Sequence, residues 1–281
     1  MLGDFIIRDI EEPCSGKAEI VRWEDSGGPL SVSFVGVNPT GHYRLRLGTE
    51  ISVDVRPDGL ETWQASHQED NSLDHFLMDQ VIPRMLADAG DHVIHAGAVR
   101  CGNSTILLVG PSGRGKSTLA ASFDQSGQPL LGDDAIIVNW LHNRPVAKSV
   151  YPSLRLFPDS IAALIPSKTD TDPVAHYTAK RRVRLPIDAS NAPASVEIAA
   201  IFVLGKPDEQ IEIRQLNEAE SCIAIVSNSF ALDPSDAGRA FRRLEASSRL
   251  ARAVPAFDLR YPRDYARLPA VHDAILARIA G

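Results

Sequence analysis

Apolar and polar residues alternate along much of the first part of the chain, which is the pattern of β-strands with one buried face. The alternation is regular in Tyr43–Leu47 and in Ile51–Val55. Turn-forming residues at Arg56–Gly59 separate the second stretch from Leu60–Trp63, which predicts a hairpin. We therefore predict that residues 1–68 form a β-rich N-terminal section, packed on the rest of the chain as a scaffold or docking face.

The spacing of apolar residues changes to that of an α-helix at Ser72. Ser72 is a suitable N-cap and Gly90 a suitable stop, and Pro83 is expected to kink or divide the helix. The apolar positions expected to face the core are Leu73, Phe76, Leu77, Val81 and Met85. The next segment, His92–Val99, has the pattern of a single strand.

Strand and helix patterns then alternate to the end of the chain. Further strands are expected at Ile106–Val109, Ala199–Leu204, Ile211–Leu216 and Pro255–Tyr261. Helices are expected from near Gly115 to near Gly127 and at Ser160–Ile165, Ala237–Ala253 and Leu268–Ile279, with a mobile loop over residues 166–178. This order predicts an α/β fold, with residues 69–281 forming one unit.

A glycine-rich motif connects a predicted strand to a predicted helix. It matches the Walker A pattern and comprises Gly110, Pro111, Ser112, Gly113, Arg114, Gly115, Lys116, Ser117 and Thr118. Its glycines let successive backbone N–H groups approach phosphate oxygens, and the helix N-terminus favours the same anion. Lys116 would reach the β- and γ-phosphates, and Ser117 would bind the bridging magnesium ion. The motif therefore predicts binding of ATP with Mg²⁺.

Two neighbouring acids, Asp133 and Asp134, lie at a predicted turn between apolar segments. In nucleotide enzymes with such a loop, an acidic element completes the magnesium site or aligns the nucleophile. Aspartates are also common in β-turns, so the pair alone leaves both a structural and a functional role open. Further on, Lys180–Arg184 carries four cations, which either form a solvated face or reach the phosphate site.

Composition narrows the classes of function. The chain has 281 residues and a formal net charge of −7, which argues against nucleic acid as the main partner. Its three cysteines match no metal-ligand spacing, as expected for reduced thiols. We see neither a signal peptide nor an apolar stretch of the roughly 18 residues that a membrane span requires. We therefore expect a cytoplasmic protein that binds neither nucleic acid nor membranes.

Three features along residues 92–138 together resemble the catalytic domain of the HPr kinase/phosphorylase family. They are His95 ahead of the loop, the loop itself, and the Asp133 and Asp134 pair before an apolar strand. The spacing is similar too, since His95 lies 21 positions before Lys116 and Asp134 lies 18 after it. The resemblance implies a P-loop kinase core of the HPr kinase and phosphoenolpyruvate carboxykinase type, which transfers the γ-phosphoryl group of ATP to a serine of a small protein.

The same resemblance implies residue roles. Lys116 and the loop amides would hold the triphosphate, and Ser117 and Asp133 would serve the metal. Asp134 would orient or deprotonate the attacking hydroxyl, and His95 would lie near the transferred phosphate or would simply be a histidine at a strand end. The family often assembles into rings, so a homo-oligomer is compatible with the resemblance, although no motif in the sequence encodes one.

The sequence also departs from the family pattern. The family's separate N-terminal domain is not recognisable in the first 90 residues, and its Glu-Ile-Arg-Gly signature is absent, with Tyr151–Arg155 in roughly that place. These departures weaken the case for HPr as the substrate and for the reverse phosphorolysis. The chain resembles the divergent branch of HPr-kinase-related proteins, some of which phosphorylate ribosomal peptides such as lasso-peptide precursors.

Three functions therefore stay open at this stage. The first is an ATP- and Mg²⁺-dependent kinase that acts on a serine of a peptide or small protein. The second keeps this chemistry but uses a hydroxyl group of a small molecule as the acceptor. The third is a nucleotide-gated binding or sensor module without transferase activity.

Overall fold

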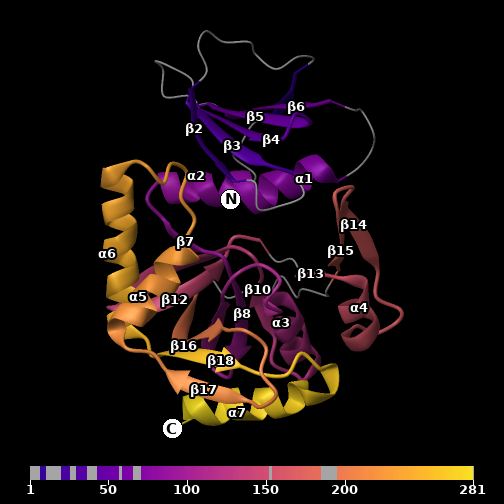
Figure 1. The fold of residues 1–281 in the computed structure, drawn as a ribbon, viewed down its shortest axis with the longest axis vertical. Coiled ribbons are helices and arrows are strands. Elements are labelled where there is room, and N and C mark those ends of the chain that lie inside the picture. Colours follow the sequence, from indigo (N-terminus) through magenta and orange to yellow (C-terminus); the bar gives the residue numbers. More distant parts are fainter. Residues whose placement is uncertain are drawn as a thin grey trace.

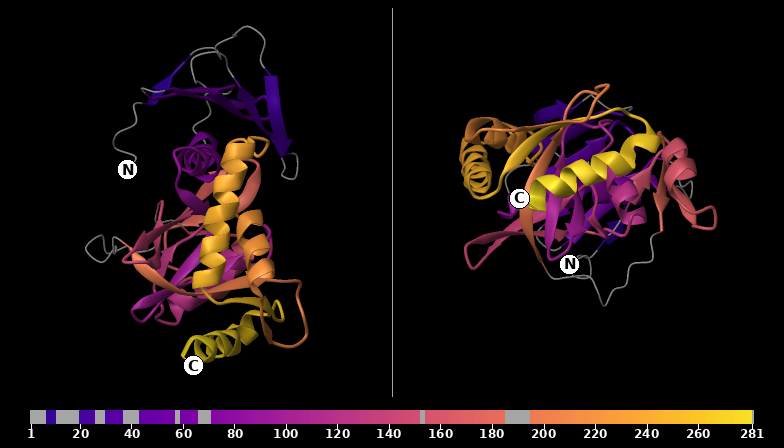
Figure 2. Two further views of the ribbon diagram at one scale, coloured as in Figure 1. Left: turned by 90° about the vertical axis from the view of Figure 1, so that its left-hand side faces the viewer. Right: turned by 90° about the horizontal axis from the view of Figure 1, so that it is seen from below.

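The computed structural model has three β-sheets and a set of helices in a mixed α/β arrangement (Figures 1 and 2). The residues that the structure describes are 7–10, 20–25, 30–36, 43–56, 59–65, 71–151, 154–184 and 195–280. Among them, none of the helices combines the length and apolar character needed to cross a membrane.

The N-terminal section forms a six-stranded sheet with the strand order β1-β6-β5-β4-β3-β2. Its strands are β1 (Ile7–Asp9), β2 (Ile20–Asp25), β3 (Val32–Gly36), β4 (Tyr43–Leu47), β5 (Ile51–Arg56) and β6 (Gly59–Gln64). The alternating stretches that predicted β4, β5 and β6 are thus confirmed, whereas the turn residues Pro57 and Asp58 lie outside the described residues. The apolar face, including Leu45 and Val53, packs on the helical segment that follows. The domain boundary near residue 68 stays a prediction.

That segment lies between the N-terminal sheet and the rest of the molecule (Figure 1). It consists of α1 (Ser72–Phe76), a π-helical turn η2 (Leu77–Val81) and α2 (Ile82–Asp88). The predicted N-cap at Ser72 is wrong by one residue, because Asn71 precedes the helix and the Ser72 hydroxyl bonds to His176 Nδ1 at 2.9 Å. The predicted disturbance at Pro83 is confirmed, since a π-helical turn precedes this residue, whose ring and missing N–H disfavour a regular helix.

A nine-stranded sheet forms the centre of the molecule. Its strands are β7 (His92–Ile94), β8 (Ala96–Cys101), β9 (Ser104–Val109), β10 (Leu130–Gly132), β11 (Ile136–Leu141), β12 (Arg144–Ser149), β16 (Val196–Leu204), β17 (Glu212–Gln215) and β18 (Ala256–Arg260). The expected single strand over His92–Val99 is wrong. The strand is interrupted at His95. As a result β7 pairs with β11, while β8 pairs with β9 and β10.

Strand β16 is the branch point of this sheet. One edge pairs in parallel with β9, while the other pairs with β12 near the start of β16 and with β18 near its end. Because β9, β16 and β18 are parallel, their carboxyl ends meet at one edge of the sheet. Ligands of open α/β sheets bind outside such an edge.

Helices cover both faces of the central sheet. One face packs against α3 (Lys116–Gln125) and α7 (Leu268–Ala280), and the other against α5 (Glu218–Ser227) and α6 (Ala237–Ala253). The helices predicted in the regions of α3, α6 and α7 are confirmed. We did not predict α5, although the capping box formed by Asn217 and Glu220 marks its start.

The third sheet is small and has the strand order β13-β15-β14. Its strands are β13 (Leu154–Leu156), β14 (Thr171–Ala175) and β15 (Thr178–Val183), with helix α4 (Pro158–Leu164) after β13. It packs beside α3 through Ala121, Leu154 and Val183. The mobile loop expected over residues 166–178 is therefore wrong in part, because β14 and the start of β15 form a paired hairpin there.

Candidate functional site

The glycine-rich motif forms the connection between β9 and α3, at the edge where the parallel strands end. Gly110, Gly113 and Gly115 have φ values of 140°, 77° and 84°, which side chains with a Cβ rarely adopt. A Cβ on Gly110 would also lie 3.0 Å from the Leu204 carbonyl oxygen of β16. These glycines allow the chain to turn sharply into α3, with Pro111, Ser112 and Gly113 exposed to solvent.

Lys116 begins α3 and turns back over its own loop. Its Nζ donates to the Gly110 carbonyl at 2.7 Å and to the Pro111 carbonyl at 3.3 Å. Burial lowers the pKa of Lys116, and the carboxyls of Asp134 and Asp133 oppose this shift. The ammonium is therefore held by carbonyls of its own loop, where the charges of both acids act on it.

Two residues after β18, Tyr261 and Arg263, lie beside the glycine-rich loop. The sequence analysis did not identify them. A Cβ on Gly115 would lie 3.2 Å from Arg263 Nη1 and 3.4 Å from the Tyr261 hydroxyl oxygen. Arg263 stacks on the Tyr261 ring, with its Cζ 4.2 Å from the ring centroid, and donates to the Gly205 carbonyl at 3.2 Å. A guanidinium group is thus fixed beside the loop, in a position that no local motif marks.

Thr118 faces a different neighbour. Its hydroxyl lies 3.1 Å from the Ser160 hydroxyl, which in turn lies 3.1 Å from the Tyr265 hydroxyl in the 3₁₀ turn η3 (Tyr265–Arg267). This hydrogen-bonded chain joins α3 to α4. Thr118 therefore fastens the first turn of α3 rather than pointing at the exposed part of the loop.

Asp133 is a fully buried carboxylate with the Ser117 side chain nearby. Its exposed fraction is 0%, and neither carboxylate oxygen has a hydrogen-bond partner among the described residues. Burial and the neighbouring Asp134 raise the pKa of Asp133 to about 7, against the opposing influence of Ser117 and Arg155. A buried polar group without partners is costly, so this carboxylate fits a position that a bound cation would satisfy.

Gly97 of β8 leaves room beside this carboxylate. A Cβ at Gly97 would approach Asp133 Oδ1 to 3.4 Å and the Lys116 carbonyl oxygen to 3.8 Å. The described residues contain no group of three or more His, Cys, Asp or Glu side chains arranged to hold a metal. Mg²⁺ bound together with a nucleotide needs only one or two protein oxygens, since phosphates and water supply the rest. Ser117 and Asp133 match that requirement.

Asp134 differs from Asp133 in being firmly paired. Its φ of 70° is unusual for a residue other than glycine, although aspartate tolerates it better than most. Its Oδ2 accepts from Arg155, at 2.8 Å from Nε and 2.6 Å from Nη2. Burial acts to raise the pKa of Asp134, but the Arg155 guanidinium outweighs it and holds the pKa below its ordinary value.

Arg155, on β13, belongs to the cluster around Asp134, and the sequence analysis missed its role. Only 4% of this residue is exposed, and its remaining donors go to Asp79 and His75 on the helical segment before β7. Burial and Arg155 lower the pKa of His75 to about 4, so its neutral ring accepts a hydrogen bond from Arg155. A buried arginine requires acidic partners, but this burial is evident only in the structure.

His95 lies at the break between β7 and β8. Its backbone N–H donates to Asn228 O at 2.7 Å, and its Nε2 lies 3.9 Å from Asp134 Oδ1. Burial and the nearby Lys116 lower the pKa of His95 to about 4, so the ring is neutral at pH 7. The break in the strand thus brings a neutral imidazole to the acid pair and the loop.

The cationic run Lys180–Arg184 divides into two groups. Arg181 bonds to Thr171, and Arg184 pairs with Asp172 at 2.7 Å, so both tie the hairpin together. Lys180 contributes to lowering the pKa of both Lys116 and Asp134, and its Nζ lies 5.5 Å from the Phe157 ring centroid. The charge of Lys180 therefore acts on the site, while Arg182 contacts Met78 Sδ at 3.6 Å.

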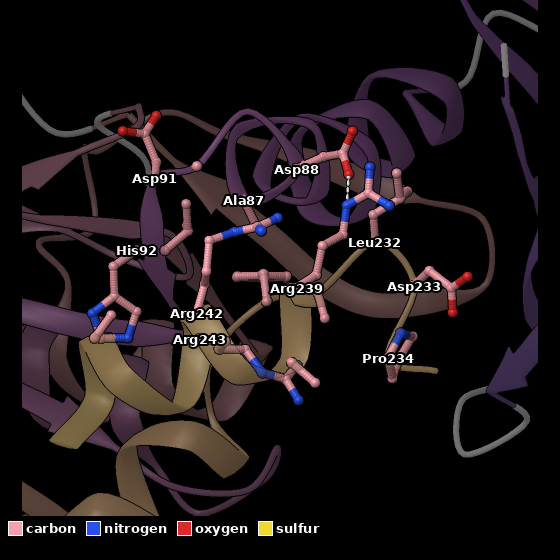
Figure 3. A pocket seen from close by; sticks show the side chains of 16 residues that line it. Ala87, Asp88, Asp91, His92, Leu232, Asp233, Pro234, Arg239, Arg242 and Arg243 are labelled. Atoms are coloured by element: carbon pink, nitrogen blue, oxygen red, sulfur yellow. Dashed lines mark ion pairs between the residues drawn. The ribbon is translucent and has the colours of Figure 1, made fainter. Parts of the chain in front are cut away.

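A separate pocket of about 70 Å³ lies between α2, β7 and α6, and it contains none of the residues described above for the site (Figure 3). Arg239, Arg242 and Arg243 line it, with Asp88, Asp91 and Asp233 as counter-charges. Arg239 pairs with Asp88 at 2.6 Å, as the dashed line in Figure 3 shows. Its charges are balanced, and the glycine-rich loop lies elsewhere.

No protein-family model and no curated protein matches the chain. Among solved structures, one similar chain is the HPr(Ser) kinase/phosphatase from Coxiella burnetii, at 12% sequence identity and a TM-score of 0.32. The match covers 66% of the present chain and 88% of that chain. This similarity is too low to assign the roles of residues in the site, so the site is described from its own geometry.

Proposed function

We propose that this protein is an ATP- and Mg²⁺-dependent kinase that transfers the γ-phosphoryl group to a serine hydroxyl of a peptide or small protein. The observation that carries the proposal is the contrast within the acid pair beside the loop. Asp133 is buried and accepts no hydrogen bond among the described residues, with Ser117 nearby, whereas Asp134 is ionised and held by Arg155. One acid is thus free for a cation, and the other can accept a proton.

In the proposed reaction the loop amides and Lys116 hold the triphosphate, and Arg263 and Lys180 supply further positive charge near it. Mg²⁺, bound through Ser117 and Asp133, would offset the charge on the phosphates. The acceptor oxygen forms a bond to the γ-phosphorus while the bond to the bridging oxygen of ADP breaks. The hydroxyl proton passes to Asp134, and neutral His95 can hydrogen-bond to the incoming hydroxyl or to the transferred group.

The choice of a peptide acceptor rests on the sequence resemblance to HPr-kinase-related proteins, which includes kinases of ribosomal peptides. The N-terminal sheet and the β14–β15 hairpin flank the helical segment that contains α1 (Figure 1), and they offer strands beside which an extended peptide could bind. A lasso-peptide precursor is one acceptor of this class.

The test is transfer of labelled γ-phosphate from ATP with Mg²⁺, to a panel of serine peptides and to serine-containing small molecules. Asp134→Asn is the matched variant, because asparagine also tolerates a positive φ and keeps the shape of the side chain. We expect label on a peptide serine and a loss of at least roughly a hundredfold in the variant, with ATP affinity unchanged.

Three other outcomes would contradict this assignment. Label on a metabolite alone would indicate a small-molecule kinase. Binding of ATP without any transfer would indicate a nucleotide-gated module. Equal turnover by wild type and Asp134→Asn would remove Asp134 from the chemistry.

A further inference from the structure

The guanidinium group of Arg155 uses all three of its nitrogens in specific contacts. Nε donates to Asp134, and Nη2 is shared between Asp134 Oδ2 and Asp79 Oδ1, each at 2.6 Å. Nη1 donates to His75 Nδ1. A planar fork held at each nitrogen cannot rotate, so its partners determine its orientation.

Two of these partners come from the helical segment beneath the N-terminal sheet, not from the central sheet. His75 lies on α1, and Asp79 lies on the π-helical turn η2 before Pro83. The opposite side of this segment packs under the six-stranded sheet through Phe76 and Val81. π-Helical turns are rare and occur frequently at functional sites. Here the turn carries a carboxylate to a buried arginine in another sheet.

The arrangement leaves the two oxygens of Asp134 in different situations. Oδ2 accepts from Arg155 Nε and lies 2.6 Å from Nη2, whereas Oδ1 lies 3.9 Å from His95 Nε2. Rotation of Arg155 would therefore rotate the Asp134 carboxylate and change which oxygen faces the loop. Because the backbone at Asp134 already has a positive φ, its own conformation offers no simple alternative placement.

We propose that Asp79 is a positioning residue: acting through Arg155, it orients the Asp134 carboxylate so that Oδ1 faces the reacting hydroxyl. This inference rests on the proposed kinase function for its kinetic consequence. It makes the helical segment under the N-terminal sheet part of the machinery of the site. Asp79 accepts hydrogen bonds from Arg155 and, at its other oxygen, from the Gln80 side chain, so its direct link to the Asp134 carboxylate is Arg155.

The kinetic test compares Asp79→Asn with Asp79→Glu and with Asp88→Asn. Asp88 is the matched control, since it lies on α2 of the same segment and pairs with Arg239, away from the loop. We expect Asp79→Asn to lower kcat roughly ten- to a hundredfold while the Kd for ATP stays within about twofold. Asp79→Glu should recover part of that loss, and Asp88→Asn should retain wild-type kcat.

Two kinetic results would overturn the proposal. One is an Asp79→Asn variant whose kcat stays within about twofold of wild type. The other is an equal loss in Asp79→Asn and Asp88→Asn, which would show that the acids only fasten the segment.

A second readout does not depend on turnover. In protein labelled with ¹⁵N-arginine, the Arg155 Nε–H signal, assigned by its absence in Arg155→Lys, should be protected from solvent exchange in wild type and in Asp88→Asn. We expect faster exchange in Asp79→Asn, because the fork loses one anchor. Unchanged exchange would overturn the positioning role. If wild type transfers no phosphate but this exchange pattern is found, the kinase proposal fails while the positioning of Arg155 stands.

Discussion

The two sides of the candidate site satisfy their polar groups in different ways. On the loop side, Asp133 has no hydrogen-bond partner among the described residues, and Lys116 bonds only to carbonyls of its own loop. On the other side, Arg155, Asp134, Asp79 and His75 satisfy one another in a closed network. The polar groups on the loop side thus leave hydrogen-bonding and charge partners for a ligand to supply, whereas those on the Arg155 side already have their partners within the protein.

This difference indicates a division of work. The Arg155 network is already formed, so its side chains need not reorganise when a substrate binds. This suits Asp134, whose carboxylate must keep a fixed orientation. An unsatisfied pocket gains from binding because the ligand supplies the missing partners. The loop side would thus determine affinity, and the Arg155 side would determine the rate of the chemical step.

The largest expected difference between the two sides is in the free energy of unfolding after the buried cation of each side is replaced by alanine. Arg155→Ala leaves the buried Asp134 carboxylate and the half-buried Asp79 carboxylate without their partner and should cost about 3–5 kcal/mol of unfolding free energy. Lys116→Ala removes hydrogen bonds within one loop and should cost only about 1 kcal/mol. Urea denaturation of the two variants, with nucleotide absent, measures both values. Equal losses would show that the two sides do not differ as described.

The next largest expected effect is the stability that the protein gains on binding ATP and Mg²⁺. At a concentration of ATP and Mg²⁺ near one hundred times Kd, wild type should gain about 2.7 kcal/mol of stability. Lys116→Ala should lose this gain, whereas Asp79→Asn should keep it, because only the first change touches the loop. Thermal unfolding with and without nucleotide provides the measurement. A gain in Lys116→Ala as large as in wild type would contradict the assigned role of the loop.

The two aspartates should respond to pH with opposite sign. The pKa of Asp133 is raised to about 7, so the folded state holds its proton more tightly than the unfolded state. The resulting stability is complete below pH about 4 and is lost as the pH rises through 7. Asp133→Asn should therefore gain stability relative to wild type between pH 5 and 8, reaching on the order of 2 kcal/mol without Mg²⁺.

Asp134→Asn is the control for that experiment. The pKa of Asp134 is lowered, so its contribution is present at neutral pH and is lost as the pH falls below the usual range for aspartate. This variant should be less stable than wild type at pH 7. Denaturation midpoints in EDTA from pH 5 to 8 test both, and a parallel pH dependence of the two variants would contradict the assignment.

Local sequence patterns predicted most of the elements but not where they break or pair. Alternation identified β4 and β5, and helical spacing identified the segment beginning at Ser72. The break at His95 escaped prediction because β7 and β8 are both apolar, and only long-range pairing puts them in different parts of the sheet. The hairpin over Thr171–Val183 escaped because its strands are mostly polar and lack a regular alternation of buried and exposed residues.

The same limit applies to the site. The glycine spacing predicted the loop conformation, because φ values near +80° require particular residues. Arg155, Asp79 and Arg263 lie on three distant segments, and nothing in their local sequence connects them. The different environments of Asp133 and Asp134 arise from these long-range neighbours, so adjacent residues of the same type could not be distinguished beforehand.

The branched pairing of β16 also affects the order in which the molecule can be completed. During synthesis β9 and the loop emerge early, but β16 and then β18 with Tyr261 follow only after long intervening segments. Parallel pairs between such distant segments form slowly, because a large loop must close first. Strands β2 to β6 of the N-terminal sheet pair as consecutive antiparallel hairpins and can pair much sooner. A nascent chain would therefore complete the candidate site late in its folding. Nucleotide would then stabilise the protein after it has folded and would not guide the earlier steps.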